Sequence, residues 1–224
     1  VHLELLQHAD SLNEVGKPNK PFAVFDHSQH RYAIAQTDFT DAYESLHQEV
    51  KPLYQSDKKH YVLDSDTNSL TFELYRQENG ATINKQFTLT RGEYPIDVDY
   101  HVSNQGNTAW QQYPYAELRQ HVAEKRSWWG HTASQQGMIS TDQNPFQKIK
   151  LKHFSRQNSF QKTTKGWLAW VEPYFASAWI SKLSAITYYN HCENNMYVLG
   201  MLGDQWRVLP GETQKGHWSL YAGP

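Results

Sequence analysis

The sequence has 224 residues, 38% hydrophobic and 14% aromatic, which is enough to build a packed core in one large domain or two small ones. Its 21 basic and 23 acidic residues are interspersed and give a net charge of −2, which argues against a nucleic-acid partner. No uncharged apolar run approaches the ~20 residues of a membrane-spanning helix. The single cysteine excludes an internal disulfide and a cysteine-based zinc site.

The first residues, VHLELLQHADSLNEVGKPNKPF, have no basic start, apolar middle or small-residue cleavage site, so they do not form a secretory signal. The abrupt start on valine suggests that the chain is a piece of a longer protein. We therefore expect any targeting information to lie outside these residues.

Short alternating segments separated by turn residues predict strands along most of the chain. Besides the hairpin described next, strands are predicted near 22–26, 31–36, 60–64, 108–119, 147–154, 166–171, 174–180, 184–190, 196–202, 205–209 and 216–222. Only residues 40–50 indicate a short helix, and residues 120–146 are predicted to be a long loop. Many regularly spaced strands, without a repeat or a linker, favour one all-β domain over 1–224, a large antiparallel sandwich or barrel.

The clearest prediction is a β-hairpin. Asn79 and Gly80 separate two β-rich runs, 70–77 and 82–90, and suit a type I′ turn because both central residues need positive φ. After a further turn, apolar residues alternate with polar ones from Ile96 to Ser103. We therefore expect this strand to have one buried side and one side facing solvent.

Twelve histidines invite a metal-site hypothesis, but no pair has a strong ligand spacing, and we expect neither a metal nor a cofactor. His101 could converge with Asp97 or Asp99 on one strand face, although a solvated face explains these residues at least as well. His191 and Cys192 suggest a thiol with its base, but adjacent strand residues point to opposite faces, so they should not meet.

The stretch from Gln143 to Val171 contains no acidic residue. Its basic residues are Lys148, Lys150, Lys152, Arg156, Lys162 and Lys165. In KIKLKHF the lysines alternate with Ile149 and Leu151, which predicts a positive row on one face of a strand. Two roles stay open: the lysines protect an edge strand from aggregation, or they form a basic surface for an acidic partner or lipid headgroups.

The most apolar stretch, KGWLAWVEPYFASAWI at 165–180, holds three of the eight tryptophans. Glu172 and Pro173 in its middle exclude a membrane span and predict two short strands bent at these residues. We expect the large aromatic side chains to pack between the sheets. These side chains are Trp167, Trp170, Phe175 and Trp179.

Three sets of motifs occur in a characteristic order. A strand, a basic-Gly-acidic-Tyr turn and an alternating strand ending in Asn run from Phe87 to Asn104 and include Arg91, Gly92 and Tyr94. A Gly-Trp-centred segment then ends in Tyr-Phe-x-x-Ala-Trp-Ile, and its members are Gly166, Trp167, Tyr174, Phe175, Ala178, Trp179 and Ile180. A Pro-Gly turn and a terminal aromatic-x-Gly-Pro close the chain. With these motifs the chain resembles the large periplasmic domain (P1) of the YidC membrane protein insertases of Gram-negative bacteria.

This resemblance implies a β-supersandwich similar to the galactose mutarotase fold, with little helix, on the periplasmic side of the inner membrane and tethered by flanking transmembrane helices. In the family, insertion is attributed to the membrane core, so no catalytic residue is carried over and no enzyme activity is expected. The implied role is a monomeric accessory domain of an insertase and chaperone. Its implied partners are translocon components of the SecD/SecF and SecYEG types and nascent membrane proteins. The basic stretch is the hypothetical partner surface, on charge alone.

The implied fold leaves an alternative open, a sugar-binding or aldose epimerase domain in which a carboxylate base and a histidine acid act on a sugar. The residues available for these roles are Glu172, Asp99, His101 and His153. No motif assigns them to one cleft.

Overall fold

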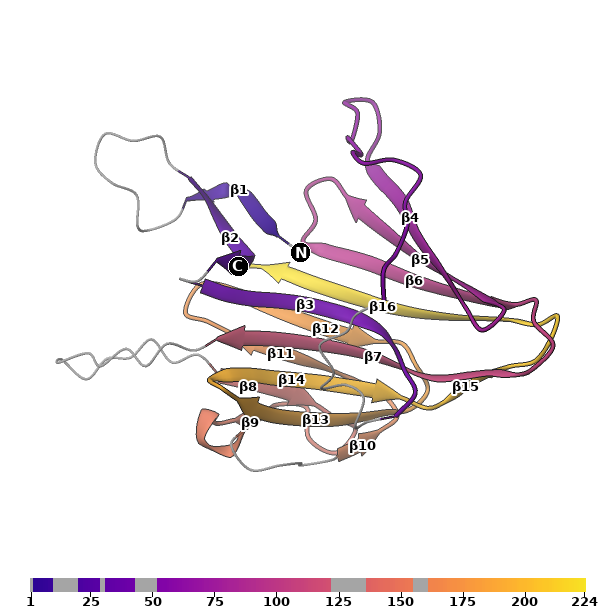
Figure 1. Ribbon diagram of the computed structural model, residues 1–224. Helices are drawn as coiled ribbons and strands as arrows, with labels where there is room; N and C mark the ends of the chain where they lie inside the picture. Colours follow the sequence, from indigo (N-terminus) through magenta and orange to yellow (C-terminus); the bar gives the residue numbers. More distant parts are fainter. Residues whose placement is uncertain (1, 10–19, 29–30, 43–51, 122–135, 155–160) are drawn as a thin grey trace, which may run out of the picture.

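Two antiparallel sheets pack around a shared core in the computed structural model (Figure 1). All residues are described except 1, 10–19, 29–30, 43–51, 122–135 and 155–160. The two sheets confirm the prediction of an all-β sandwich with little helix.

The first sheet has the strand order β1-β2-β3-β7-β14-β13-β10, and β15 pairs with the beginning of β7. Its strands are β1 (Leu3–Ala9), β2 (Pro21–Ser28), β3 (Arg31–Thr40), β7 (Trp110–His121), β10 (Gln161–Thr163), β13 (Ile186–Glu193), β14 (Met196–Gly203) and β15 (Trp206–Val208). The long strand β7 lies at the centre and hydrogen-bonds to β3 on one side and β14 on the other.

The second sheet has the strand order β4-β5-β6-β16-β12-β11-β8-β9. Its strands are β4 (Ser69–Glu78), β5 (Ala81–Thr90), β6 (Pro95–Asn104), β8 (Gln136–Ser140), β9 (Gln147–Ile149), β11 (Gly166–Val171), β12 (Ala176–Ser181) and β16 (Thr213–Gly223). One turn of 3₁₀ helix, η2 (Leu151–His153), follows β9. The outermost strands are therefore β1 and β10 in the first sheet, and β4 and β9 in the second.

The predicted hairpin forms between β4 and β5. Glu78 pairs with Ala81 across a two-residue turn in which Asn79 and Gly80 have φ of 51° and 80°, as a type I′ turn requires. The alternation predicted for the next strand is also confirmed from Val98 onward: in β6, Val98, Tyr100 and Val102 are fully buried, and the residues between them are half-buried. Ile96, at the start of the strand, is half-buried.

The tryptophan-rich stretch forms two strands interrupted at Glu172 and Pro173, as predicted, but β12 begins at Ala176 and not at 174, and β11 and β12 pair as an antiparallel hairpin. Trp170 and Trp179 are 2% and 1% exposed and belong to the core. Trp167 does not pack between the sheets, because it lies three residues from Trp170 and a strand places odd-spaced residues on opposite faces.

Two other aromatic residues of this stretch lie outside the strands. Phe175 is half-buried in the turn before β12, where its ring stacks on Phe22 of β2 with centroids 3.9 Å apart. Tyr174 is 81% exposed and is not a core residue.

Three sequence predictions require correction. Residues 60–64 do not form a strand; in this region the only bridge between described residues joins Gln55 to Tyr75. Residues 120–146 are not one loop, because β8 inserts between β11 and β9. The strand predicted at 147–154 ends at Ile149.

Most of the predicted helix at 40–50 lies outside the described residues, and its first residue, Thr40, ends β3. Within the described ranges, no helix has the length and apolar character that crossing a bilayer requires.

Candidate functional site

The lysine stretch lies where the two sheets end. β9 and β10 are the outermost strands on this side of the sandwich, in the lower part of Figure 1, so the predicted edge strand is confirmed for β9. The described basic side chains are all exposed: Lys148, Lys150, Lys152, Lys162 and Lys165. Arg156 lies outside the described residues.

These lysines do not form one row on one strand face. Only Lys148 lies in β9, because the strand ends at Ile149 and the chain turns into η2. A 3₁₀ turn has three residues per turn, so the two-residue alternation that predicted the row stops there. The turn brings Phe154 into the core, where it is 1% exposed.

Asp142 ties the two sheet edges together. Its Oδ2 accepts hydrogen bonds from the Thr163 hydroxyl at 2.9 Å, and from the Thr164 hydroxyl and main-chain N at 2.6 and 2.8 Å. These bonds, that of the Thr164 side chain foremost, lower the pKa of Asp142. We therefore group the lysines beside both edges under one name, the basic edge: Lys148, Lys150, Lys152, Lys162 and Lys165.

One lysine of the basic edge has a carboxylate partner that the sequence did not predict. Lys162 Nζ lies 3.4 Å from Asp204 Oδ1, and both side chains are about two-thirds exposed. An exposed pair of this kind contributes at most about 1 kcal/mol, so a stronger acidic partner could replace Asp204 at little cost.

The four residues of the epimerase hypothesis are distributed over three separate elements. Asp99 and His101 are on the solvent-facing side of β6, where Asp99 Oδ1 hydrogen-bonds with His217 Nδ1 at 2.8 Å. His153 lies in η2 beyond β9, with four strands between β9 and β6. Glu172 is in the turn between β11 and β12. The fold does not assemble these groups into an acid-base pair.

The histidines and the cysteine were candidates for a metal site or a reactive thiol. In the part of the chain that the structure describes, no group of three or more His, Cys, Asp or Glu side chains could hold a metal ion. His191 and Cys192 are neighbours within β13 and therefore lie on opposite faces of the strand, as predicted.

The glycine of the Gly-Trp motif has a structural role. Gly166 has φ of 154°, and a Cβ there would lie 2.0 Å from the Ser140 main-chain oxygen. The Tyr188 hydroxyl fills the remaining space and donates to the main-chain oxygens of Ser140 and Trp167 at 2.7 and 3.1 Å. Only glycine allows β8, β11 and β13 to approach this closely.

The basic-Gly-acidic-Tyr turn is also structural. Arg91 donates to the main-chain oxygens of Asp64 and Thr67 at 2.6 and 3.3 Å, and Gly92 has φ of 76°. The Tyr94 hydroxyl lies 3.2 Å from His8 Nε2, so the turn is connected to β1.

The sequence did not predict a buried carboxylate at the centre of the first sheet. Glu117 of β7 is 0% exposed, and its Oε2 accepts from Gln36 Nε2 at 2.5 Å and Arg119 Nε at 2.8 Å. Its Oε1 accepts from the Tyr189 hydroxyl at 2.6 Å, and the Tyr189 ring crosses over Gly200, where any Cβ would lie 2.2 Å from it. The network joins β3, β7, β14 and β13.

A second buried cluster joins the sheets. Asp38 of β3 accepts from the Tyr54 hydroxyl at 2.7 Å and from Arg76 Nη2 at 3.3 Å. Lys85 Nζ donates to the Thr37 main-chain oxygen at 2.6 Å and lies 5.4 to 5.6 Å from three aromatic ring centroids. These charges hold the β4–β5 hairpin against β3.

The burial of Lys85 and of two tyrosines predicts that the free energy of unfolding is greatest near pH 10. Burial lowers the pKa of Lys85 to about 8, so between pH 8 and ~10.4 only the unfolded chain keeps this proton, and stability rises with pH. Burial raises the pKa of Tyr100 and Tyr189 well above 10. Unfolded tyrosines ionise first above pH 10, so stability then falls by about 1.4 kcal/mol per pH unit for each.

Urea unfolding at pH 7, 9.5 and 11 measures this profile. Lys85→Met should remove the rise between pH 8 and 10 and leave the fall above pH 10. Equal stability of the wild-type protein at all three pH values would contradict the lowered pKa of Lys85 and the raised pKa of Tyr100 and Tyr189.

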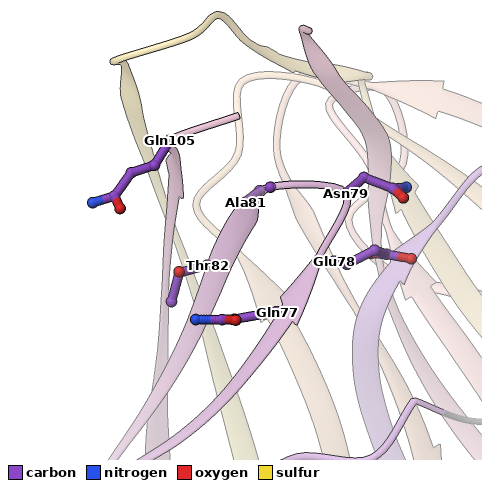
Figure 2. Close-up of a pocket in the computed structure, with 7 residues that line it drawn as sticks. Gln77, Glu78, Asn79, Ala81, Thr82 and Gln105 are labelled. Atoms are coloured by element: carbon purple, nitrogen blue, oxygen red, sulfur yellow. The ribbon is translucent and has the colours of Figure 1, made fainter. Parts of the chain in front are cut away.

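A polar hollow of about 340 Å³ opens at the tip of the β4–β5 hairpin. Figure 2 shows its lining, which comes from the ends of β4 and β5 and the turn after β6: Gln77, Glu78, Asn79, Gly80, Ala81, Thr82 and Gln105. Glu78 is its one ionisable residue, and Glu78 forms an ion pair with Arg76 at 2.6 Å. The hollow therefore presents no acid-base pair.

Comparison with known proteins gives one family. A family model described as the YidC periplasmic domain matches residues 1–224. The membrane protein insertase YidC of Pseudomonas entomophila is 30% identical over 213 residues, which are 92% of this chain and 38% of that protein. The Pseudomonas putida KT2440 protein of the same name is 31% identical over 218 residues, with the same shares. The chain thus spans just over a third of the length of these relatives.

Solved structures resemble the chain in fold. An α-galactosidase from Geobacillus stearothermophilus has a TM-score of 0.50 at 9% identity, over 85% of this chain and 27% of that one. A galactose mutarotase related enzyme from Lactobacillus acidophilus has a TM-score of 0.49 at 9% identity, over 76% and 71% of the two chains. At such identities a likeness concerns the fold and not sugar chemistry.

Proposed function

The chain belongs to the family of YidC periplasmic domains, and we propose that it serves a membrane protein insertase as a non-catalytic interaction module. The observation that carries this proposal is the family match over the whole chain. The geometry supports it, because the described buried charges are engaged in joining strands and sheets, and the acid-base candidates are spread over β6, η2 and the turn before β12.

In this proposal residues 1–224 form one monomeric sandwich domain on the periplasmic side of the bacterial inner membrane, held there by transmembrane segments of the longer protein. The insertase activity belongs to those segments. The domain contributes contacts to translocon components of the SecD/SecF and SecYEG types and to nascent membrane proteins.

The basic edge is the proposed partner surface. Five exposed lysines lie beside two sheet edges, and two carboxylates near them are already engaged, Asp142 by threonine hydroxyls and Asp204 by Lys162. The lysines attract an acidic protein surface and speed its association. Lysines also protect edge strands from aggregation, so the two roles must be separated by a binding measurement.

Removing three lysines of the basic edge tests the proposal. We expect Lys148→Ala, Lys150→Ala and Lys152→Ala together, in the full-length insertase, to reduce co-purification of translocon components severalfold, because rim charges set the association rate. The control carries the same charge change at exposed lysines elsewhere: Lys58, Lys59 and Lys215. Equal co-purification of both triple variants would leave the lysines of the basic edge with the edge-protecting role only.

A further inference from the structure

An exposed aromatic pair lies beside the basic edge. Phe146, in the connection between β8 and β9, is 69% exposed. Its ring meets that of Trp167 edge to face, with centroids 6.0 Å apart and an interplanar angle of 62°. Trp167 is half-buried on the outer face of the second sheet. The core residues Leu168 and Trp170 lie on the other face of the same strand.

The strand register extends this pair into a flat apolar patch. Trp167 pairs with Ile180 of β12, which is 37% exposed, and Ala169 on the same face of β11 pairs with Met138 of β8. The patch therefore crosses three neighbouring strands, and it is named the aromatic patch: Phe146, Trp167, Ile180 and Met138.

Positive charge borders the aromatic patch. Lys148 of β9 pairs with Met138 and so lies on the same face of the sheet, and Lys165 precedes β11 by one residue. Asp142, in the same connection as Phe146, accepts hydrogen bonds from Thr163 and Thr164. An apolar centre with a charged rim is the arrangement of a protein-binding hot spot.

We propose that the aromatic patch is the anchor of the partner surface, and that its occupant is an acidic protein segment that seats an apolar side chain on Phe146 and Trp167. This inference rests on the proposed function and names the chemistry of the partner. The loss of an exposed lysine pair lowers affinity by about fivefold at most, whereas the loss of a buried aromatic anchor lowers it by about 30-fold or more. The lysines then steer the encounter, and the aromatic patch sets the lifetime of the complex.

The shape of the patch favours a protein over a lipid surface. Its side chains spread over three strands, and the two rings pack on each other. An apolar centre that spans several strands and has a charged rim matches the anatomy of a protein interface.

A photo-crosslinking amino acid, p-benzoylphenylalanine, tests the patch when it replaces Phe146 in the full-length insertase in native membranes. We expect an adduct with a translocon component, joined through a segment that mass spectrometry shows to be acidic. The matched control carries the same amino acid at Leu53, which is 90% exposed and outside the basic edge, and should give no such adduct. Adducts at position 146 with lipids only would overturn the inference.

A substitution separates the anchor from the lysines. Phe146→Ser exposes no buried core, because Phe146 is already largely in solvent. At 0.3 M salt, which screens exposed charges, this variant should lower translocon co-purification more than the double variant Lys148→Glu with Lys165→Glu. A loss of about 2 kcal/mol of binding free energy at the anchor corresponds to about a 30-fold loss of affinity. If adducts form from Lys150 or Lys162 but not from position 146, the anchor is wrong and the proposed function stands. If none of the three positions gives an adduct, both are wrong.

Discussion

Replacing Trp179 by alanine is expected to lower the free energy of unfolding by about 3 to 5 kcal/mol. The side chain is 1% exposed within the shared core, so its removal leaves a cavity that the two sheets cannot close without shifting. Its Nε1 also donates to the Glu117 main-chain oxygen at 3.0 Å, a bond between β12 of the second sheet and β7 of the first. Urea unfolding of the two proteins at pH 7 measures the difference.

Tyr174→Ala is the matched control, because Tyr174 lies in the same motif and is 81% exposed. Its expected effect is within about 0.5 kcal/mol. A Trp179→Ala protein of wild-type stability that has lost partner binding would make Trp179 a contact residue and not a core residue.

Replacing Glu117 by glutamine is expected to lower the free energy of unfolding by about 3 to 5 kcal/mol. The carboxylate is 0% exposed and accepts hydrogen bonds from Gln36, Arg119 and Tyr189. Glutamine has only one accepting oxygen, and its amide nitrogen would face hydrogen-bond donors. Arg119 would then stay charged and half-buried without a carboxylate at position 117. Thermal and urea unfolding measure the loss.

Glu93→Gln makes the same chemical change at an exposed site in the turn after β5, where it should alter stability by no more than about 0.5 kcal/mol. Equal stability of the Glu117→Gln and Glu93→Gln proteins would show that the network is not needed to join the strands of the first sheet.

Local signals predicted the strands well. The Asn79-Gly80 turn and the alternation in β6 depend on backbone conformation and on one buried face, both of which a short segment determines by itself. The same holds for the bend at Glu172 and Pro173, where proline cannot continue a ladder.

Orientation and burial at the edges could not be predicted in the same way. In Gly166–Val171 both faces of the strand carry apolar residues, so alternation could not tell that Trp167 faces outward and Trp170 inward. Glu117 and Arg119 alternate with apolar neighbours and resemble a solvated face. Their burial depends on Gln36 and Tyr189, which lie 81 and 72 residues from Glu117 in the sequence.

The position of the basic edge, the proposed partner surface, was predicted only in part. Composition located the lysines, and the sheet order confirms that β9 is an edge strand. The turn into η2 after Ile149 broke the predicted row, and only the register shows that Lys148 shares a face with Met138 beside Trp167. A local pattern contains no information on such cross-strand neighbours.

Crosslinking from Lys150 and Lys162 in intact membranes tests the central claim most directly, because both lysines are exposed and lie beside different sheets of the sandwich. A lysine-specific or genetically placed crosslinker at either position of the full-length insertase is expected to capture a translocon component of the SecD/SecF or SecYEG type. The same crosslinker at Lys58, an exposed lysine outside the basic edge, should not. No translocon adduct from Lys150 or Lys162, or equal yields from all three positions, would contradict the account.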